Sequence, residues 1–180
     1  KYMIAIISAT NRPASRTEFV SRNLFEMIGK YTDEEVNLIN LSEVDPGFVH
    51  AKMYEAEFQH PDLTKIQDEQ IIPADKWIIV SPEYNGSYSG IGKVFVDALS
   101  IRKYAETFKG KKLALVGVAT GRAGNLRGLD HLTTSFNYLG MKVFPNRLPL
   151  ANITDHMVGD GFDADTTETL DRFVEGFVSF

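Results

Sequence analysis

The stretch that decides the fold runs from Lys76 to Gly90 and reads KWIIVSPEYNGSYSG. Its first part, residues 76–80, is dominated by large apolar side chains, which predicts a buried strand. Residues 81–90 are rich in Ser, Gly, Tyr and Asn, which predicts a polar loop directly after that strand. Residues 91–101 then supply a helix. Strand, polar loop and helix in this order form the basic unit of an α/β fold.

The same order recurs along the rest of the chain. We expect further strands at residues 2–8, 36–41, 112–118 and 142–148, and further helices at 18–28, 63–72, 129–139 and within 165–180. Residues 42–59 contain a turn at Asp45-Pro46-Gly47 but no clear periodicity, so we expect a loop over the sheet edge. Five strands alternating with helices predict a single α/β domain over residues 1–180. We expect this domain to be a three-layer sandwich, in which helices cover both faces of a five-stranded parallel sheet.

The composition excludes several classes of function. With 180 residues, 43% of them hydrophobic and 24% charged, the chain suits one soluble domain, and it has no segment long and apolar enough for a membrane span. The absence of cysteine removes disulfides, thiolate nucleophiles and Cys-type metal sites. A net charge of -5 argues against a general nucleic-acid surface. Residues 1–7 lack the pattern of a signal peptide, so we expect the cytoplasm.

Metal and hydrolase chemistry are also not expected. The four histidines, His50, His60, His131 and His156, are scattered and lack the spacing of metal ligands. No serine lies in a G-x-S-x-G elbow, which leaves a serine hydrolase unsupported. We therefore assign no metal ligand and no catalytic acid or base. Any redox chemistry would need a cofactor.

The first loop that could bind a ligand spans residues 8–17 and reads SATNRPASRT. In open parallel sheets, ligands bind beyond the carboxyl ends of the strands. The loop combines hydroxyl groups with Arg12 at the expected start of a helix, where backbone N–H groups and the helix dipole favour a phosphate. The alternative is that Ser15 or Thr17 only caps the helix and Arg12 is solvated. This loop alone leaves both interpretations open.

The loops after the third and fourth expected strands have similar chemistry. In residues 81–90, Pro82 and Gly86 shape the backbone, while Asn85 and the backbone amides offer polar contacts and Tyr84 an aromatic ring. The alternative is an ordinary turn with surface tyrosines. Residues 119–128 form a Gly-rich loop after the fourth strand. Together the three loops predict one site at the same edge of the sheet.

Residues 74–87, ADKWIIVSPEYNGS, resemble the hallmark segment of the NADPH-dependent FMN reductase family. The first loop resembles that family's phosphate loop, Gly-Ser-x-Arg-x-x-Ser, with Ala9, Thr10, Arg12 and Ser15 in the corresponding places. Residues 120–125 resemble its third loop, with Asn125 where a second glycine is common. The resemblance extends in order from about residue 4 to about residue 143. Ala9 and Asn125 are departures that bear on the shape of the loops.

The resemblance implies a flavodoxin-like fold, FMN as the cofactor and NADPH or NADH as the co-substrate. It implies that hydride passes from the nicotinamide to FMN and then to a small acceptor such as a flavin or a quinone. It also implies a homodimer or homotetramer, for which Val94, Val96 and Leu99 are candidate contacts. The residues expected to bind FMN are Thr10, Arg12, Ser15, Arg16, Thr17, Pro82, Glu83, Tyr84, Asn85, Gly86, Thr120, Gly121, Arg122 and Gly124.

Two other functions fit the same fold. A flavodoxin-like carrier would bind FMN and shuttle single electrons between proteins, and a non-catalytic module would bind FMN without turnover. The family resemblance favours the reductase. So does the net charge of -5, because strongly acidic carriers rely on their electrostatic field to reach their partners.

Overall fold

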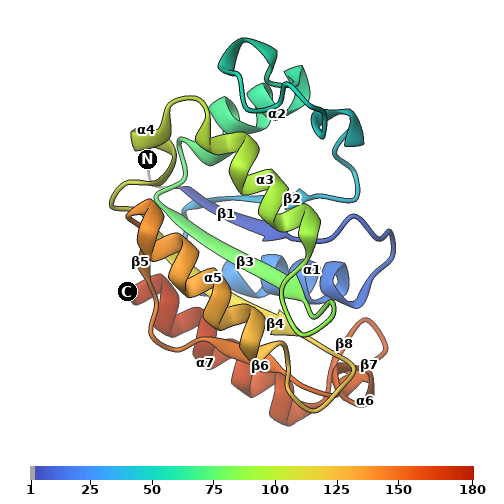
Figure 1. Ribbon diagram of the computed structural model, residues 1–180. Helices are drawn as coiled ribbons and strands as arrows, with labels where there is room; N and C mark the ends of the chain where they lie inside the picture. The colour runs from blue at the N-terminus through green and yellow to red at the C-terminus, as the bar shows by residue number, and fades with distance from the viewer. Residues whose placement is uncertain (1–2) are drawn as a thin grey trace.

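A parallel sheet organises the molecule, with its strands in the order β2-β1-β3-β4-β5 and β6 also paired to β4 (Figure 1). The computed structural model describes residues 3–180, so the part of the first expected strand that falls on Tyr2 lies outside the described residues. The expected three-layer, flavodoxin-like architecture is confirmed. The strands of the sheet are β1 (Met3–Ser8), β2 (Glu35–Asn40), β3 (Lys76–Pro82), β4 (Lys112–Val118), β5 (Lys142–Val143) and β6 (Leu148–Leu150).

The fifth expected strand, residues 142–148, is wrong as a continuous element. The structure divides it into β5 and β6, both parallel to β4. Pro145 lies between the two segments, and proline has no backbone N–H to donate to a strand ladder. Pairing with β4 therefore stops near Phe144 and resumes at Leu148.

Helices cover both faces of the sheet, as Figure 1 shows. The expected long helices are all present, with ends shifted by a few residues, and α4 is an addition that the sequence did not predict. A single π-helical turn, Gln67–Ile71, continues α2. A short antiparallel hairpin, β7 (Met157–Val158) with β8 (Gly161–Phe162), precedes the last helix. The helices are α1 (Arg16–Ile28), α2 (Pro61–Ile66), α3 (Gly90–Ser100), α4 (Tyr104–Phe108), α5 (Leu126–Leu139), α6 (Ile153–His156) and α7 (Ala164–Ser179).

Two apolar cores lie on opposite faces of the sheet because successive strand side chains point to opposite sides. Ile79 of β3 belongs to the core under α2, α3 and α5, whereas its neighbour Ile78 belongs to the core under α1 and α7. Trp77 is fully buried in the first core, where its ring packs against Phe108 of α4 at 5.7 Å between centroids. Among residues 3–180, no helix has the length and apolar character that crossing a membrane requires.

The segment 42–59 is irregular, as expected, but it is anchored. It contains 3-10 turns at Pro46–Phe48 and Ala56–Phe58, and the side chains of Phe48 and Met53 are buried in the core under α2 and α3. The Asp45 side chain accepts a hydrogen bond from the Gly47 N–H, which closes the expected turn. The segment therefore packs against the edge of the sheet through these two buried side chains.

Lys111, the residue immediately before β4, is a buried cation. Its side chain is 9% exposed, and Nζ donates to the carbonyls of Ile71 and Ile72 at 2.8 and 2.7 Å. These carbonyls lie at the end of the helical segment that begins with α2, where backbone acceptors lack partners within the helix. Burial lowers the pKa of the Lys111 ammonium from 10.5 to about 8.

Stability of the wild type relative to Lys111→Met should therefore rise as the pH increases from about 8 to 10.5. In this window the unfolded chain still holds a proton that the folded protein has released, so a rising pH disfavours the unfolded state. Lys76, whose pKa is also lowered by burial, is present in both proteins and cancels. Urea unfolding of both proteins across the window measures the difference in unfolding free energy. A difference that does not change with pH would contradict the assignment.

Candidate functional site

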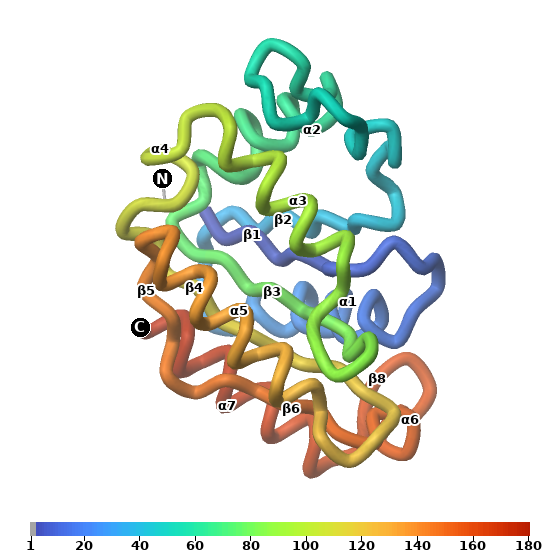
Figure 2. The backbone as a smooth tube through the Cα atoms, viewed as in Figure 1, coloured from blue at the N-terminus to red at the C-terminus, as the bar shows by residue number. Residues whose placement is uncertain are grey.

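A pocket of about 370 Å³ lies at the carboxyl ends of β1, β3 and β4. Figure 2 shows the loops that follow these strands gathered on the side of the sheet away from the C-terminus. This is the edge at which parallel α/β sheets bind ligands. The pocket is lined by Arg12, Pro13, Ala14, Ser15, Arg16, Thr17, Pro82, Glu83, Tyr84, Asn85, Gly86, Val118, Ala119, Thr120, Gly121 and Ile153.

The N-terminus of α1 forms one end of the pocket. Ser15 is the N-cap of this helix, and its Oγ accepts a hydrogen bond from the Glu18 N–H at 3.0 Å. The Glu18 carboxylate accepts in turn from the Ala14 N–H at 3.1 Å, in the manner of a capping box. The capping interpretation of Ser15 is thus correct. It does not exclude a ligand, because the Ser15 hydroxyl can still donate its own proton.

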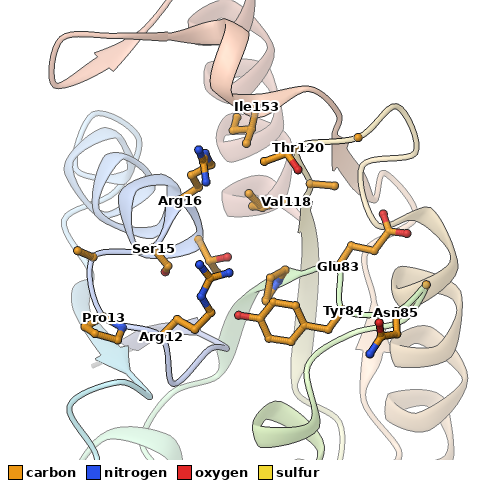
Figure 3. A pocket seen from close by; sticks show the side chains of 16 residues that line it. Arg12, Pro13, Ser15, Arg16, Glu83, Tyr84, Asn85, Val118, Thr120 and Ile153 are labelled. Carbon is orange, nitrogen blue, oxygen red and sulfur yellow. The ribbon is translucent and has the colours of Figure 1, made fainter.

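Two arginines at this end have no protein partner. Within residues 3–180, the guanidinium groups of Arg12 and Arg16 form no hydrogen bond or ion pair. Figure 3 shows the Arg12 guanidinium directed toward the space between Ser15 and Tyr84. Glu18, the nearest acid on α1, is bound to Arg22, which lowers the pKa of the Glu18 carboxyl. The positive charge at the helix N-terminus is therefore available to an anion.

Thr10 lies beneath the pocket and does not line it. Its side chain is fully buried, and its Oγ1 lies 2.7 Å from the Tyr84 hydroxyl. The Arg12 N–H also donates to Thr10 Oγ1, at 3.2 Å. With the Tyr84 hydroxyl as the donor, Thr10 keeps its own proton for another acceptor. This contact joins the loop after β1 to the loop after β3.

The loop after β3 turns tightly around Asn85 and Gly86. Tyr84 and Ser87 exchange backbone hydrogen bonds at 2.9 and 3.2 Å, and the two residues between them have φ of 52° and 78°. Positive φ at both central residues is the signature of a type I′ turn, for which Asn-Gly is a preferred sequence. Figure 3 shows the Asn85 side chain pointing away from the space beside Tyr84. In this conformation Asn85 contributes backbone to the pocket, not its side-chain amide.

Glu83 lines the pocket, but its carboxylate is engaged elsewhere. Oε2 accepts from the Asn125 N–H at 3.2 Å, and Oε1 lies 3.4 Å from the Arg127 guanidinium. In Figure 3 the carboxylate points away from the space between Arg12 and Tyr84. Glu83 thus connects the loop after β3 to the loop after β4.

The loop after β4 contributes only part of what the sequence predicts. Thr120 and Gly121 line the pocket, whereas Arg122 and Gly124 do not. Gly124 has φ +56°, and a Cβ there would lie 2.7 Å from the Pro149 carbonyl carbon. The close approach of two backbone segments therefore requires glycine at this position.

Ile153 is a pocket residue that the sequence did not indicate. It is the first residue of α6, it is 1% exposed, and its N–H donates to the Ala119 carbonyl at 3.0 Å. It belongs to a part of the chain that carries no motif and reaches the site only because β6 pairs with β4. The other unexpected lining residues are Pro13, Ala14, Val118 and Ala119. Among residues 3–180, no cluster of three or more His, Asp or Glu side chains could hold a metal ion.

Comparison with known sequences places the chain beside flavin-dependent reductases. The model of the family described as NADPH-dependent FMN reductase matches residues 2–155. An NAD(P)H-dependent FMN reductase of Pseudomonas aeruginosa is 38% identical over 71 residues, which are 39% of this chain and 38% of that protein. A 2-hydroxy-1,4-benzoquinone reductase of a Burkholderia species is 31% identical over 91 residues, 51% of this chain and 49% of that protein. The matched stretches span less than half of each relative.

Solved structures show the same fold over nearly the whole chain. The flavoenzyme NAD(P)H:(acceptor) oxidoreductase FerB of Paracoccus denitrificans superposes with a TM-score of 0.81 at 21% identity, covering 99% of this chain and 96% of that one. An FMN-dependent NADH-azoreductase of Bacillus anthracis, solved in complex with FMN, superposes with a TM-score of 0.60 at 15% identity, covering 99% and 98%. Since the family model covers well over half of the sequence, this chain belongs to the NADPH-dependent FMN reductase family.

Proposed function

We propose that this protein is an NAD(P)H-dependent oxidoreductase that holds FMN in the pocket at the carboxyl ends of β1, β3 and β4. In this proposal the enzyme takes hydride from NADPH or NADH and passes electrons to a flavin, a quinone or a similar small acceptor. The observation that carries the proposal is the pair of guanidiniums without protein partners, Arg12 and Arg16, at the N-terminus of α1. They lie in a pocket that also offers the Tyr84 ring.

The residues present fit FMN. The volume of about 370 Å³ lies within the range of cofactor pockets. Arg12, Arg16 and the Ser15 hydroxyl would hold the phosphate, whose charge the α1 N-terminus complements, while the buried Thr10 supports the Arg12 backbone from beneath. Tyr84 and the backbone of the loops after β3 and β4 would enclose the ring.

FMN, when bound, supplies the hydride and electron transfer that amino-acid side chains lack. The chain then needs to bind, orient and shield the cofactor. Glu83 is the one carboxylate among the lining residues, and it is already bound to the Asn125 N–H and close to Arg127. We therefore assign no catalytic acid or base.

The assay that tests this function measures oxidation of NADPH and of NADH by the FMN-loaded protein with free FMN and a panel of quinones. A reductase should consume at least one nicotinamide in proportion to acceptor reduced. A one-electron carrier would bind FMN and exchange electrons with redox proteins without consuming the nicotinamide. A non-catalytic module would bind FMN but would neither consume the nicotinamide nor exchange electrons with redox proteins. Either of these two results would contradict the proposal.

Tyr84→Phe should weaken FMN binding by about twofold to tenfold, because a neutral hydrogen bond contributes about 0.5 to 1.5 kcal/mol. The variant keeps the ring but loses the hydroxyl that orients Thr10. The effect on riboflavin should be smaller, since Thr10 Oγ1 accepts from the Arg12 N–H and riboflavin has no phosphate for the Arg12 loop to hold. Titrations followed by quenching of flavin fluorescence measure both affinities. If Tyr84→Phe weakened riboflavin as much as FMN, the hydroxyl would act on the ring and not through Thr10.

We also propose that the protein is a homodimer or homotetramer and that it works in the cytoplasm. Of the three residues first expected at the subunit contact, Leu99 is fully buried in the core and Val94 is partly buried against it, whereas Val96 lines a groove on this face. We propose this groove of about 650 Å³ between α3 and α5 as the contact, since it is also lined by Leu132 and bordered by Tyr138, which is 83% exposed. Sedimentation should show a dimer or tetramer at micromolar concentration, and a monomer would contradict this part of the proposal.

A further inference from the structure

Asn125, which precedes α5, connects two of the loops around the pocket. Its side chain is 1% exposed, and Nδ2 donates to the carbonyl of Pro82 at 2.8 Å and to that of Ser81 at 3.2 Å. Its backbone N–H donates to the Glu83 carboxylate at 3.2 Å. One residue of the loop after β4 thus holds three consecutive residues at the end of β3.

The Asn125 amide serves this connection and not its own helix. Asn125 is the N-cap of α5 with φ 63°, yet its side chain forms no capping hydrogen bond. Within residues 3–180, its Oδ1 is buried without a hydrogen-bond partner, whereas Nδ2 has two carbonyl acceptors. A buried acceptor left without a partner costs stability. The side chain of Asn125 is therefore held in place by its Nδ2 donors, which bind the Ser81 and Pro82 carbonyls.

We propose that Asn125 is a positioning residue that fixes the spacing of the two loops beside the flavin ring. This inference rests on the proposed function. Asn125 does not line the pocket itself, but it holds Pro82 and Glu83, which precede Tyr84, and it lies in the same loop as Thr120 and Gly121. A glycine at this position would keep the left-handed backbone but lose the connection through the amide.

The test compares Asn125→Gly and Asn125→Asp with the wild type. Glycine keeps the backbone conformation and removes the side chain, whereas Asp keeps the shape but presents oxygen atoms to two carbonyls and lies near the Glu83 carboxylate. We expect Asn125→Gly to weaken flavin binding by about tenfold, the value of one to two neutral hydrogen bonds, and Asn125→Asp to weaken it more. FMN and riboflavin should be affected by the same factor, because the phosphate end of the pocket is unchanged.

Asn152→Gly is the matched control. Asn152 is also an N-cap with positive φ, 48°, and no side-chain cap, but it is exposed. Its replacement should leave both flavin affinities unchanged. At saturating FMN, the visible circular dichroism of the bound flavin should differ between Asn125→Gly and the wild type and should be the same for Asn152→Gly, because only the first variant alters the surroundings of the ring.

Hydrogen exchange of the flavin-free proteins supplies a readout that does not depend on FMN. The Tyr84 and Ser87 amides should exchange faster in Asn125→Gly than in the wild type or Asn152→Gly, because the strand end before their turn loses the side-chain hydrogen bonds to the Ser81 and Pro82 carbonyls. If Asn125→Asp does not fold, Asn125→Gly alone decides the result.

Unchanged flavin affinities in Asn125→Gly, or unchanged exchange at Tyr84 and Ser87, would overturn the inference. A loss for FMN that spares riboflavin would also overturn it, since it would place the effect at the phosphate end. If the wild type itself bound no flavin, the proposed function would fail and so would the flavin role of Asn125. Faster exchange in Asn125→Gly would in that case still show that the side chain joins the two loops.

Discussion

Arg12→Ala should weaken FMN binding by about tenfold to a few hundredfold and leave riboflavin binding almost unchanged. Hydrogen bonds to charged groups contribute about 1.5 to 3 kcal/mol, and the Arg12 guanidinium has no protein partner within residues 3–180 that would compete with a phosphate. Riboflavin lacks the phosphate and would not register the loss. Titration of both flavins by fluorescence at fixed ionic strength measures the four affinities.

Two further variants sharpen this result. Arg12→Lys should recover only part of the lost affinity, because an ammonium lacks the planar pair of donors that a guanidinium offers to a phosphate. Arg172→Ala removes an exposed arginine of α7 that does not line the pocket, and it should change neither affinity. Equal FMN affinities for the wild type and Arg12→Ala would place the phosphate elsewhere and refute the assignment of the loop after β1.

Gly117→Ala should destabilise the protein by about 2 kcal/mol or more and abolish most flavin binding. Gly117 lies in β4, and a Cβ built on it would lie 2.1 Å from the Gly124 carbonyl oxygen and 3.0 Å from Asn125 Cβ. Because the closest of these atoms belongs to the backbone, the chain cannot relieve the overlap by a side-chain rotation. Glycine inside a strand often marks such a close approach. Urea unfolding measures the loss of stability, and a flavin titration measures the loss of binding.

Gly90→Ala is the control for Gly117→Ala. A Cβ on Gly90 meets no atom within 4 Å, and Gly90 is the first residue of α3, where alanine is the better helix former. We expect its stability to be unchanged or slightly raised. If Gly117→Ala were as stable as Gly90→Ala, the loop after β4 would have room to move, and the tight contact with Gly124 would not constrain the site.

The fold could be predicted well because its signals are local. Strands buried on both faces, such as KWIIV and KLALVGV, appear as continuous apolar runs, and polar loops end them. The elements that escaped prediction depend on tertiary contacts. The short helix α4 is stabilised by Phe108, which packs on Trp77, and the divided fifth strand reflects the missing N–H of Pro145 within a run that otherwise resembles a strand.

The sequence predicts which loops form the site, but it does not predict how every side chain in them is oriented. The motifs located Arg12 and Tyr84, because residues of these types follow strands that end at one edge of the sheet. They could not give the orientation of Glu83, whose carboxylate turns toward Asn125 and Arg127 only after two loops meet. Ile153 escaped because it reaches the pocket through the pairing of β6 with β4, which no local pattern encodes.

The break at Pro145 also changes what one edge of the sheet offers to other molecules. An uninterrupted strand at the edge of a parallel sheet presents a regular row of N–H and C=O groups that a strand of another molecule can join, which is a route to aggregation. Here that edge consists of β5 and β6, two- and three-residue segments with a proline between them. Neither segment is long enough to align a foreign strand. The irregularity that spoils the ideal fifth strand thus makes this edge of the sheet a poor template for an added strand.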